Sequence, residues 1–398
     1  MNPYLAKLQP YPFEKLAGLF RGVQAPTEKR KISLALGEPQ QATPGFIGEA
    51  LTARRETLAK YPTTRGLPEL RQAIAQWLSQ RFDLPAEVID YERQVLPVNG
   101  TREALFSFAQ SVIDASAGAT VVIPNPFYQI YEGAALLAGA EPFYVNSGRD
   151  HGYLPDFESV PASVWKRCQL LYICSPGNPT GSVYDRALLA RLIELAECYD
   201  FIIAADECYS ELYFDEDAPP PGLLQVAHAL GNEQFRRCVV FHSLSKRSSA
   251  PGLRSGFVAG DAEILHEYFR YRTYHGCAMA LPTQYASVCA WRDESHVRAA
   301  RAEYAARLRA MVAILRGALD IRMPEGAFYL WLPTPIADTA FARRLCEEEN
   351  VAVLPGSYLS RKWEGIDPGC DHVRIAAVEA LDACSDAARR IRRLALSL

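Results

Sequence analysis

The chain has 398 residues, of which 49% are hydrophobic and 22% charged, and its formal net charge is −4. This composition is typical of a globular protein, and the slightly acidic balance argues against nucleic acid or an anionic membrane as the main partner. No apolar run approaches the roughly 20 residues of a membrane-spanning helix, and no signal peptide is visible. The ten cysteines are scattered, without a Cys-x-x-Cys pair or a metal-ligand spacing. They predict reduced thiols in a cytoplasmic protein and no metal site.

Along the chain, the pattern of apolar residues predicts three segments. Residues 1–44 are expected to form an N-terminal arm and part of a smaller domain. In residues 45–280, short apolar runs such as "TVVIPNP" and "DFIIAADE" alternate with amphipathic stretches. This alternation indicates a mostly parallel sheet with helices on both faces. Residues 281–398 contain a long charged helix over 295–320, then short strands and helices, which is typical of a small α+β domain.

Polar and aromatic side chains follow the carboxyl ends of the predicted strands. In a doubly wound sheet, ligands bind beyond these ends, so the side chains are expected to converge on one crevice. They belong to Asn99-Gly100-Thr101, Pro126-Phe127-Tyr128, "SPGNPTG" with Asn178, "DECY" with Asp206 and Tyr209, and "SLSK" with Lys246. Each has an ordinary structural explanation by itself, such as a helix cap for Asp206 or a turn for Asn178.

Together, these residues fit one cofactor, pyridoxal 5'-phosphate. Its aldehyde needs a lysine, for which Lys246 is the candidate, and its ring nitrogen needs a carboxylate, which Asp206 offers. Asn178 and Tyr209 are candidate donors to the phenolic oxygen. The apolar run before Asp206 predicts a buried carboxylate, and a buried charge needs a positive partner.

The phosphate and the ring face of this cofactor also have candidates. A phosphate favours a helix N-terminus with cations or hydroxyls, and Tyr128 offers a flat neighbour for the ring. The phosphate candidates are Gly100, Thr101, Ser243 and Arg254. Signatures of other classes are absent: the chain has no G-x-G-x-x-G between a strand and a helix, no G-x-x-x-x-G-K-[ST], no H-E-x-x-H and no G-x-S-x-G.

The stretch "SLSKRSSAPGLRSG" resembles the pyridoxal-lysine signature of class I/II aminotransferases, S-x-[ST]-K-x(7)-R-x-G. The motifs "YPTTRGLPELR", "NGTREAL", "PFY", "SPGNPTG", "DECY" and "HVRI" occur in the order of that family, from near residue 33 to the C-terminus. The resemblance implies fold type I of the pyridoxal-phosphate transferases, with a large α/β domain around a mostly parallel, seven-stranded sheet and a smaller α+β domain. It also implies that Lys246 holds the cofactor as a Schiff base and that Arg254 neutralises its phosphate.

Further site residues follow from the same resemblance. Gly37 in "LGEP" matches the backbone contact to the substrate α-carboxylate, and Arg374 in "HVRIA" matches the arginine that binds this group with its planar guanidinium. Tyr61 in "KYPTTRG" resembles the tyrosine that reaches the phosphate of the neighbouring subunit, which implies a homodimer with shared active sites. The cofactor-binding residues expected from the motifs are Tyr61, Gly100, Thr101, Arg102, Tyr128, Asn178, Asp206, Tyr209, Ser243, Ser245, Lys246 and Arg254.

The implied activity is the transfer of an amino group by ping-pong Schiff-base chemistry, with Lys246, Asp206 and Tyr209 as catalytic residues. Several stretches, among them "PNPFYQIYEGAALLAGAEPFYV", are similar to bacterial N-succinyldiaminopimelate aminotransferases of the lysine and cell-wall pathway. We therefore expect small-molecule substrates, namely glutamate, 2-oxoglutarate and N-succinyl-L,L-diaminopimelate. Alternatives are an aspartate, alanine or aromatic aminotransferase, a β-lyase, or a non-enzymatic regulator with a cofactor-binding sensor domain.

Both glutamate and N-succinyldiaminopimelate carry a second carboxylate beyond the reacting centre. Because Arg374 is expected at the α-carboxylate with Gly37 and Asn178, a second cation is needed for the distal group. Arg102 is the first candidate. The helix dipole disfavours a cation in the first turn of a helix, so an arginine at this position is better explained by a binding role than by helix stability. Arg272 in "YRTYHG" is the second candidate.

Overall fold

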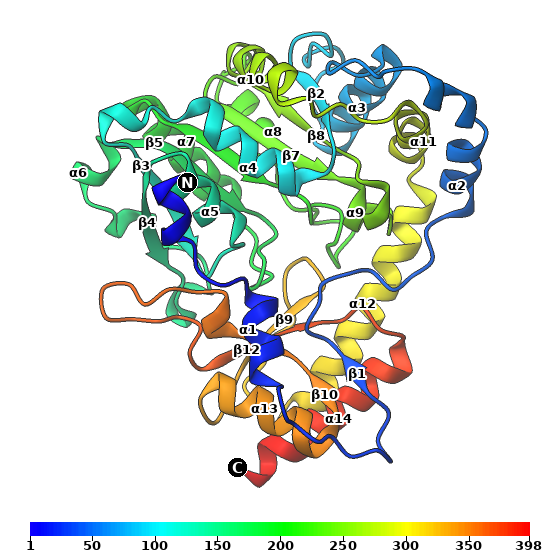
Figure 1. The fold of residues 1–398 in the computed structure, drawn as a ribbon, viewed down its shortest axis with the longest axis vertical. Coiled ribbons are helices and arrows are strands. Elements are labelled where there is room, and N and C mark those ends of the chain that lie inside the picture. Colours follow the sequence, from blue (N-terminus) through cyan, green and yellow to red (C-terminus); the bar gives the residue numbers. More distant parts are fainter.

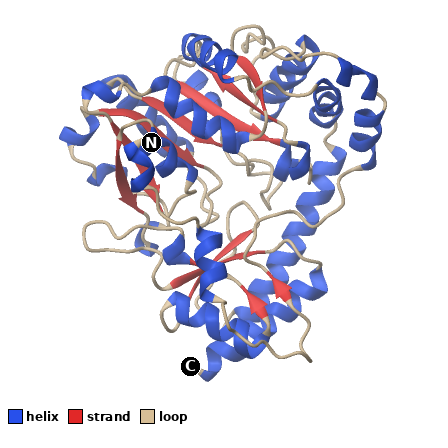
Figure 2. Ribbon diagram, in the orientation of Figure 1, coloured by secondary structure: helices blue, strands red, loops and turns tan.

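A seven-stranded β-sheet forms the centre of the larger part of the molecule in the computed structural model, which describes residues 1–398 (Figures 1 and 2). The strand order is β2-β8-β7-β6-β5-β3-β4. Only β8 runs antiparallel to its neighbours, and the remaining pairs are parallel, so the predicted mostly parallel α/β fold is confirmed. The strands are β2 (Val95–Val98), β3 (Thr120–Asn125), β4 (Glu141–Asn146), β5 (Cys168–Cys174), β6 (Ile202–Asp206), β7 (Cys238–Ser243) and β8 (Gly256–Gly260).

Helices cover both faces of this sheet, which explains why its strands are apolar at successive positions. Neighbouring side chains on a strand point to opposite faces, so Val121 and Ile123 of β3 pack in one core and Val122 in the other. The helices of the first core are α4 (Thr101–Val112), α5 (Ile130–Leu137) and α10 (Ala262–His275). Those of the second are α2 (Gly45–Thr52), α3 (Pro68–Arg81), α6 (Ala162–Trp165), α7 (Arg186–Tyr199), α8 (Leu223–Ala229), α9 (Leu244–Arg247) and α11 (Leu281–Arg292).

The smaller part of the molecule packs three helices against a three-stranded antiparallel sheet of order β11-β12-β9. Its core includes Ile32 and Leu34, and β1 pairs in parallel with β10, so the segment before residue 44 completes this part. The strands are β1 (Ile32–Ser33), β9 (Tyr329–Pro333), β10 (Val351–Ala352), β11 (Leu354–Pro355) and β12 (His372–Ala376). The helices are α12 (Ser295–Leu315), α13 (Asp338–Glu349) and α14 (Leu381–Ser397).

Two elements run between the parts. Helix α12, yellow in Figure 1, leads from the larger part into the smaller one. The N-terminal segment, in blue, runs from the larger part to helix α1 (Pro12–Leu19), which packs on the smaller part through Leu16. The sequence predicts an irregular N-terminal arm, but Pro12 stands at the first helical position, where its fixed φ favours a helix. None of the helices has the combination of length and apolar character that a membrane crossing requires.

The structure departs from the predicted elements in two instructive places. Helix α12 ends at Leu315 instead of residue 320, because Gly317 adopts a φ of +83° that terminates the helix. The sequence did not indicate α11, because polar Gln284 and Ser287 are fully buried on it and break its apolar period. Gln284 is satisfied there by accepting from Leu67 N at 2.6 Å and donating to Met279 O at 2.7 Å.

Helix α11 also bears on where the larger part ends. Ala286, Val288, Ala290 and Trp291 belong to the core beneath the seven-stranded sheet. A boundary between residues 280 and 281 would separate this helix from the core that it fills. We therefore propose a boundary near residue 293, before α12, while the division into three segments otherwise stays a prediction.

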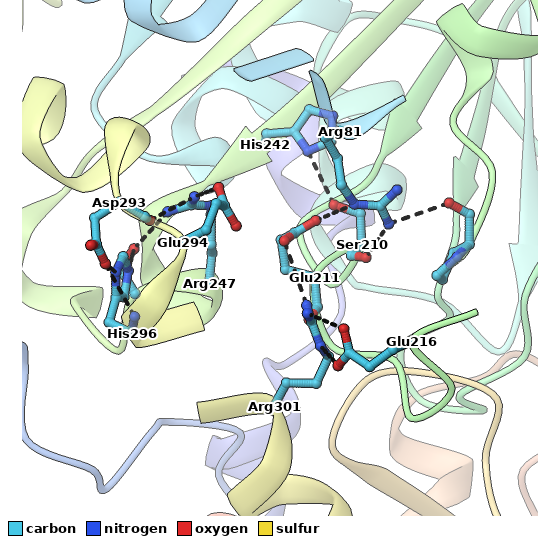
Figure 3. Close-up of polar contacts among 12 residues, drawn as sticks. Arg81, Ser210, Glu211, Glu216, His242, Arg247, Asp293, Glu294, His296 and Arg301 are labelled. Carbon is cyan, nitrogen blue, oxygen red and sulfur yellow. Dashed lines mark hydrogen bonds and ion pairs between the residues drawn. The ribbon is translucent and has the colours of Figure 1, made fainter. Parts of the chain in front are cut away.

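Buried charges join α12 to the larger part (Figure 3). Glu211 is only 3% exposed and lies between Arg81 of α3, whose Nε donates to Glu211 Oε1, and Arg301 of α12, whose Nη1 is 3.7 Å from Glu211 Oε2. Arg301 also binds Glu216 through two contacts of 2.6 and 2.8 Å. One buried carboxylate therefore compensates two largely buried guanidinium groups from different helices.

We expect Glu211→Gln to lower the free energy of unfolding by about 3 kcal/mol, because it leaves two buried cations without their shared anion. Glu216→Gln is the matched control: Glu216 binds the same Arg301 but its side chain is 63% exposed, so its loss should cost less than about 1 kcal/mol. Denaturant-induced unfolding measures both values. Equal losses in the two variants would contradict the central role of Glu211.

Candidate active site

A cavity of about 450 Å³ lies between the two parts of the molecule and the N-terminal arm. The carboxyl ends of β6 and β7 and the start of α4 form one side, and β9, β11 and β12 supply residues from the other. The predicted site residues that line it are Gly37, Thr101, Arg102, Tyr128, Asn178, Asp206, Tyr209, Ser243, Ser245, Lys246, Arg254 and Arg374. Groups far apart in the sequence therefore meet in one place, as the strand-end pattern predicts.

Lys246 lies on the short helix α9, directly after β7. Its Nζ donates to the carbonyl oxygen of Gly37 from the N-terminal segment. Burial lowers the pKa of Lys246 to about 8, and the nearby Arg374 and Arg102 act in the same direction. A larger fraction of this amine than of an ordinary lysine is consequently unprotonated, and so nucleophilic, near neutral pH.

Asp206 ends β6 and is 4% exposed. Its Oδ2 accepts from Tyr131 Oη at 2.7 Å and its Oδ1 from Cys208 N at 3.3 Å, but no arginine or lysine forms an ion pair with it. Burial raises the pKa of this carboxyl above its ordinary value. A buried carboxylate that faces a cavity and has no ion-pair partner fits the protonated ring nitrogen of pyridoxal 5'-phosphate.

Arg374 on β12 has the complementary property. It is 4% exposed, its Nη1 donates to Asn178 Oδ1 and its Nη2 to Ala35 O, both at 2.8 Å. Its Nε has no partner and no carboxylate is paired with the group. The guanidinium lies 4.5 Å from the ring centroid of Tyr329. An arginine buried with an unused donor fits the carboxylate of a ligand.

The start of α4 and Arg254 form an end of the cavity suited to an anion. Gly100 caps α4 with a φ of +83°, which favours glycine, and Arg254 Nη2 lies close to it. Arg254 donates to Pro251 O and Asn99 O but to no acidic group. The hydroxyl groups of Thr101, Ser243 and Ser245 line the same cavity. Together these donors fit a phosphate.

Several cavity residues were not predicted from the sequence. Tyr329 lies in an apolar strand, so its sequence context indicates a core residue, but its Oη is 2.8 Å from Tyr209 Oη. The same Tyr329 Oη lies so close to Gly37 that a Cβ on this residue would overlap it, so the hydroxyl packs against the Gly37 backbone. Tyr11 reaches the site from the arm, where its Oη accepts from Arg102 Nη2 at 3.1 Å. The others are Pro12, Phe13, Leu36, Glu38, Gln129, Cys208, Pro251, Leu354 and Leu359.

Three predicted residues do not line the cavity: Gly100, which lies beside Arg254 at its edge, Arg272 and Tyr61. For Arg272 the expected role is wrong. Arg272 is fully buried on α10, where it donates to Glu103 Oε2 at 2.8 Å, Tyr268 Oη at 3.2 Å and Cys277 O at 2.8 Å. Its charge is already compensated, so it does not bind a distal carboxylate. Tyr61 is fully exposed, and its contact to a second subunit stays a prediction.

Comparison with known proteins supplies independent findings. Residues 29–381 match the family described as "Aminotransferase class I and II". The chain is 31% identical over 373 residues to the LL-diaminopimelate aminotransferase of Nitratidesulfovibrio vulgaris (strain DP4), covering 91% of this chain and 92% of that one. It is also similar to the crystal structure of an aminotransferase from Neisseria meningitidis Z2491, with 47% identity, a TM-score of 0.95, and 99% and 100% of the chains covered.

A further solved structure resembles the fold at lower identity. The "probable N-succinyldiaminopimelate aminotransferase" from Thermus thermophilus is 25% identical, with a TM-score of 0.84, over 96% of this chain and all of that one. The names of this structure and of the Nitratidesulfovibrio relative thus point to related substrates that differ in one acyl group.

We expect Lys246 to react with an amine-acylating reagent far faster than an ordinary lysine. At pH 8 about half of an amine with a pKa of about 8 is unprotonated, against less than about 1% at an ordinary lysine pKa. Mass spectrometry of the cofactor-free protein, labelled briefly over a pH series, gives the apparent pKa of each lysine. The exposed Lys166 serves as the internal reference, and a Lys246 titration no lower than that reference would contradict the expected burial.

Proposed function

The chain belongs to the class I and II aminotransferases, and from that premise we propose that it transfers an amino group between glutamate and N-succinyl-L,L-diaminopimelate, with 2-oxoglutarate as the keto acid. Pyridoxal 5'-phosphate is the cofactor of this family and fold. When bound, it supplies an aldehyde that exchanges amino groups and a protonated ring that withdraws electrons from the substrate Cα–H bond. Arg374 carries the proposal, because its buried and unpaired guanidinium suits the α-carboxylate that every amino-acid substrate brings.

Lys246 would perform two tasks. Its amine, more easily deprotonated than that of an ordinary lysine because burial lowers its pKa to about 8, would attach the cofactor through the aldehyde carbon. Once released, the same amine would accept the proton from the substrate Cα and return it to the cofactor carbon, first as a general base and then as an acid. A pKa near the working pH suits both directions of this transfer.

The remaining predicted residues would hold the cofactor and the substrate. Asp206 would keep the ring nitrogen protonated, and Asn178 and Tyr209 would donate to the phenolic oxygen. Tyr128 would cover a ring face, and Arg374 would bind the α-carboxylate beside the Gly37 backbone. The phosphate-binding residues would be Gly100, Thr101, Ser243, Ser245 and Arg254. Tyr61, which is fully exposed, would reach the phosphate of a second copy in a homodimer.

Arg102 would bind the distal carboxylate of a dicarboxylic substrate. It lines the cavity and is held by the phenol groups of Tyr128, at 2.7 Å from Nε, and Tyr11, at 3.1 Å from Nη2. These partners are neutral, so the charge of Arg102 is not compensated within the protein. An oriented, uncompensated guanidinium at the mouth of the cavity supports a substrate with a second anionic group.

A second candidate substrate is L,L-diaminopimelate itself, which the name of the relative at 31% identity suggests. Its far end carries an ammonium as well as a carboxylate, whereas succinylation replaces that ammonium by an amide and adds a carboxylate. Glu38 lines the cavity and is exposed. Its carboxylate would attract the free ammonium and repel the succinyl group, which makes Glu38 the residue that separates the two candidates.

For Asp206→Asn, we expect the rate of Cα proton removal to fall by roughly two orders of magnitude or more, because the amide keeps the shape but loses the anion that holds the ring nitrogen protonated. Single-turnover kinetics with glutamate measures this step. Cofactor content of the purified variant, read from its absorbance, controls for simple loss of binding. An unchanged single-turnover rate would contradict the assigned role.

For Arg102→Ala, we expect KM for glutamate to rise about tenfold or more, the effect of losing one charge-assisted pair, while alanine turnover stays nearly constant. Arg102→Lys keeps the charge and should recover part of the loss. Steady-state kinetics with both donors gives the comparison. Equal losses for alanine and glutamate would place Arg102 in cofactor binding or folding.

The substrate itself is tested by half-reaction rates with glutamate, N-succinyl-L,L-diaminopimelate, L,L-diaminopimelate, aspartate, alanine and phenylalanine. We expect the succinylated compound to have the highest kcat/KM among the diaminopimelates and Glu38→Gln to leave it unchanged or improve it. A preference for free diaminopimelate that Glu38→Gln reduces about tenfold would select the second candidate. A preference for alanine or phenylalanine would contradict both.

A further inference from the structure

Ser248, His296 and Asp293 form a hydrogen-bonded chain behind the lysine of the candidate active site. His296 Nε2 lies 2.8 Å from Ser248 Oγ, and His296 Nδ1 lies 2.6 Å from Asp293 Oδ1. Ser248 follows Lys246 by two residues, and Asp293 and His296 stand where α11 ends and α12 begins. Figure 3 shows His296 and Asp293 beside Arg247 and Glu294, apart from the ion pairs of Arg301.

This order of groups resembles a Ser-His-Asp nucleophile system, but its surroundings exclude that chemistry. Ser248 is 1% exposed and does not line the cavity, so no substrate reaches its Oγ. The same Oγ is also 3.4 Å from Arg247 Nη1. A nucleophile must be within reach of the bond that it attacks, and Ser248 faces only protein. The role of these hydrogen bonds is therefore to hold neighbouring segments of the protein in place.

The direction of each hydrogen bond follows from the charges around His296. Burial lowers the pKa of His296, Arg247 acts in the same direction, and Asp293 opposes both. A neutral imidazole donates from Nδ1 to the Asp293 carboxylate and accepts at Nε2. Ser248 then donates its proton to His296 and accepts from Arg247, so that every group in the chain has a partner.

The turn that these groups hold is conformationally demanding. Ser249, next to Ser248, has a φ of +46°, which is uncommon for any residue other than glycine and persists only when the surroundings enforce it. Arg247 is fully buried and donates to Ala290 O at 2.7 Å and to Glu294. Ser249 Oγ donates to Gln41 Oε1, and Thr43 Oγ1 donates to Ser249 O. The backbone just after Lys246 is thus fixed from three directions.

We propose that Ser248 and His296 are positioning residues that hold the lysine-bearing turn on the start of α12 and so place the amine of Lys246 at the reacting carbon. The proposal rests on the role of Lys246 in the proposed function. Displacement of a reacting group by about 1 Å can cost a hundredfold in rate, and the Lys246 side chain follows any movement of residues 247–249. Loss of one neutral hydrogen bond in this chain should therefore reduce kcat more than it changes KM.

Two variants of His296 separate positioning from simple folding. The amide of His296→Asn occupies the place of Nδ1, so it keeps the bond to Asp293 and loses Ser248, whereas the amide of His296→Gln reaches the place of Nε2 and keeps Ser248. Ser248→Ala removes the hydroxyl alone. Ser295→Ala is the matched control, since the exposed Ser295 bonds Asp293 at 2.9 Å but does not contact the turn.

We expect Ser248→Ala and His296→Asn to lower kcat by about three- to tenfold, the effect of one neutral hydrogen bond, with KM for glutamate within about twofold. His296→Gln and Ser295→Ala should remain near the wild type. The second readout is acylation of Lys246 in the cofactor-free protein: in Ser248→Ala and His296→Asn the released lysine becomes more hydrated, and its apparent pKa rises from about 8 toward the ordinary value.

Equal kcat values for His296→Asn and His296→Gln, or an unchanged Lys246 titration in Ser248→Ala, would overturn the proposal. Thermal unfolding of all four variants identifies any loss that comes from folding alone, which would affect the two His296 variants equally. The labelling readout also keeps the test separate from the proposed function. If Lys246→Ala retained turnover, the assigned activity would fail, but the effect of Ser248 on the Lys246 amine would still be measurable.

Discussion

Buried charges without a charged partner dominate the structure around the cavity. Asp206 and Arg374 are both 4% exposed and neither forms an ion pair, although an uncompensated buried charge costs several kcal/mol. The fold tolerates this because both side chains stand on strands that are hydrogen-bonded on two sides, β6 between β5 and β7 and β12 between β9 and β11. A ligand that brings a protonated ring nitrogen and a carboxylate would neutralise both groups, and its binding would stabilise the folded state by mass action.

The first turns of α12 are bonded to the larger part of the molecule and would move with it. His296 is bonded to the turn that carries Lys246, and Arg301 is bonded to Glu211, two residues beyond Tyr209. Farther along the same helix, Leu308 and Leu315 lie in the core of the smaller part. Movement of the smaller part relative to the sheet would therefore bend or pivot α12 below Arg301 and leave the lysine and the cofactor side of the cavity in place. Arg374, which stands on β12, would move with the smaller part toward or away from them.

Local patterns predicted the larger part of the molecule well, because parallel strands buried on both faces leave continuous apolar runs and end at one edge of the sheet. The cavity residues supplied by β6, β7 and α4 followed directly from that rule. Tyr329 and Tyr11 could not be predicted in the same way, because they approach from the smaller part and the arm, whose placement depends on contacts between distant segments. The prediction for Arg272 failed for a related reason. Its partner Glu103 is 169 residues away in sequence, so no neighbouring residue showed that the charge of Arg272 is compensated.

The charges lining the cavity also limit what it can bind. Four cations (Arg102, Lys246, Arg254 and Arg374) face two anions (Glu38 and Asp206), which leaves a surplus of two positive charges. A phosphate of charge near −2 would balance that surplus. The positive charge that Lys246 would lose once bonded to the cofactor would be replaced by that of the protonated ring nitrogen. A dicarboxylic amino acid, with net charge −1, then enters a site whose remaining unpaired cations are Arg374 and Arg102. An amino acid with an apolar side chain would bring no anion for Arg102 and would leave it uncompensated beside two neutral phenols. The electrostatics therefore favour substrates with an acidic group at both ends.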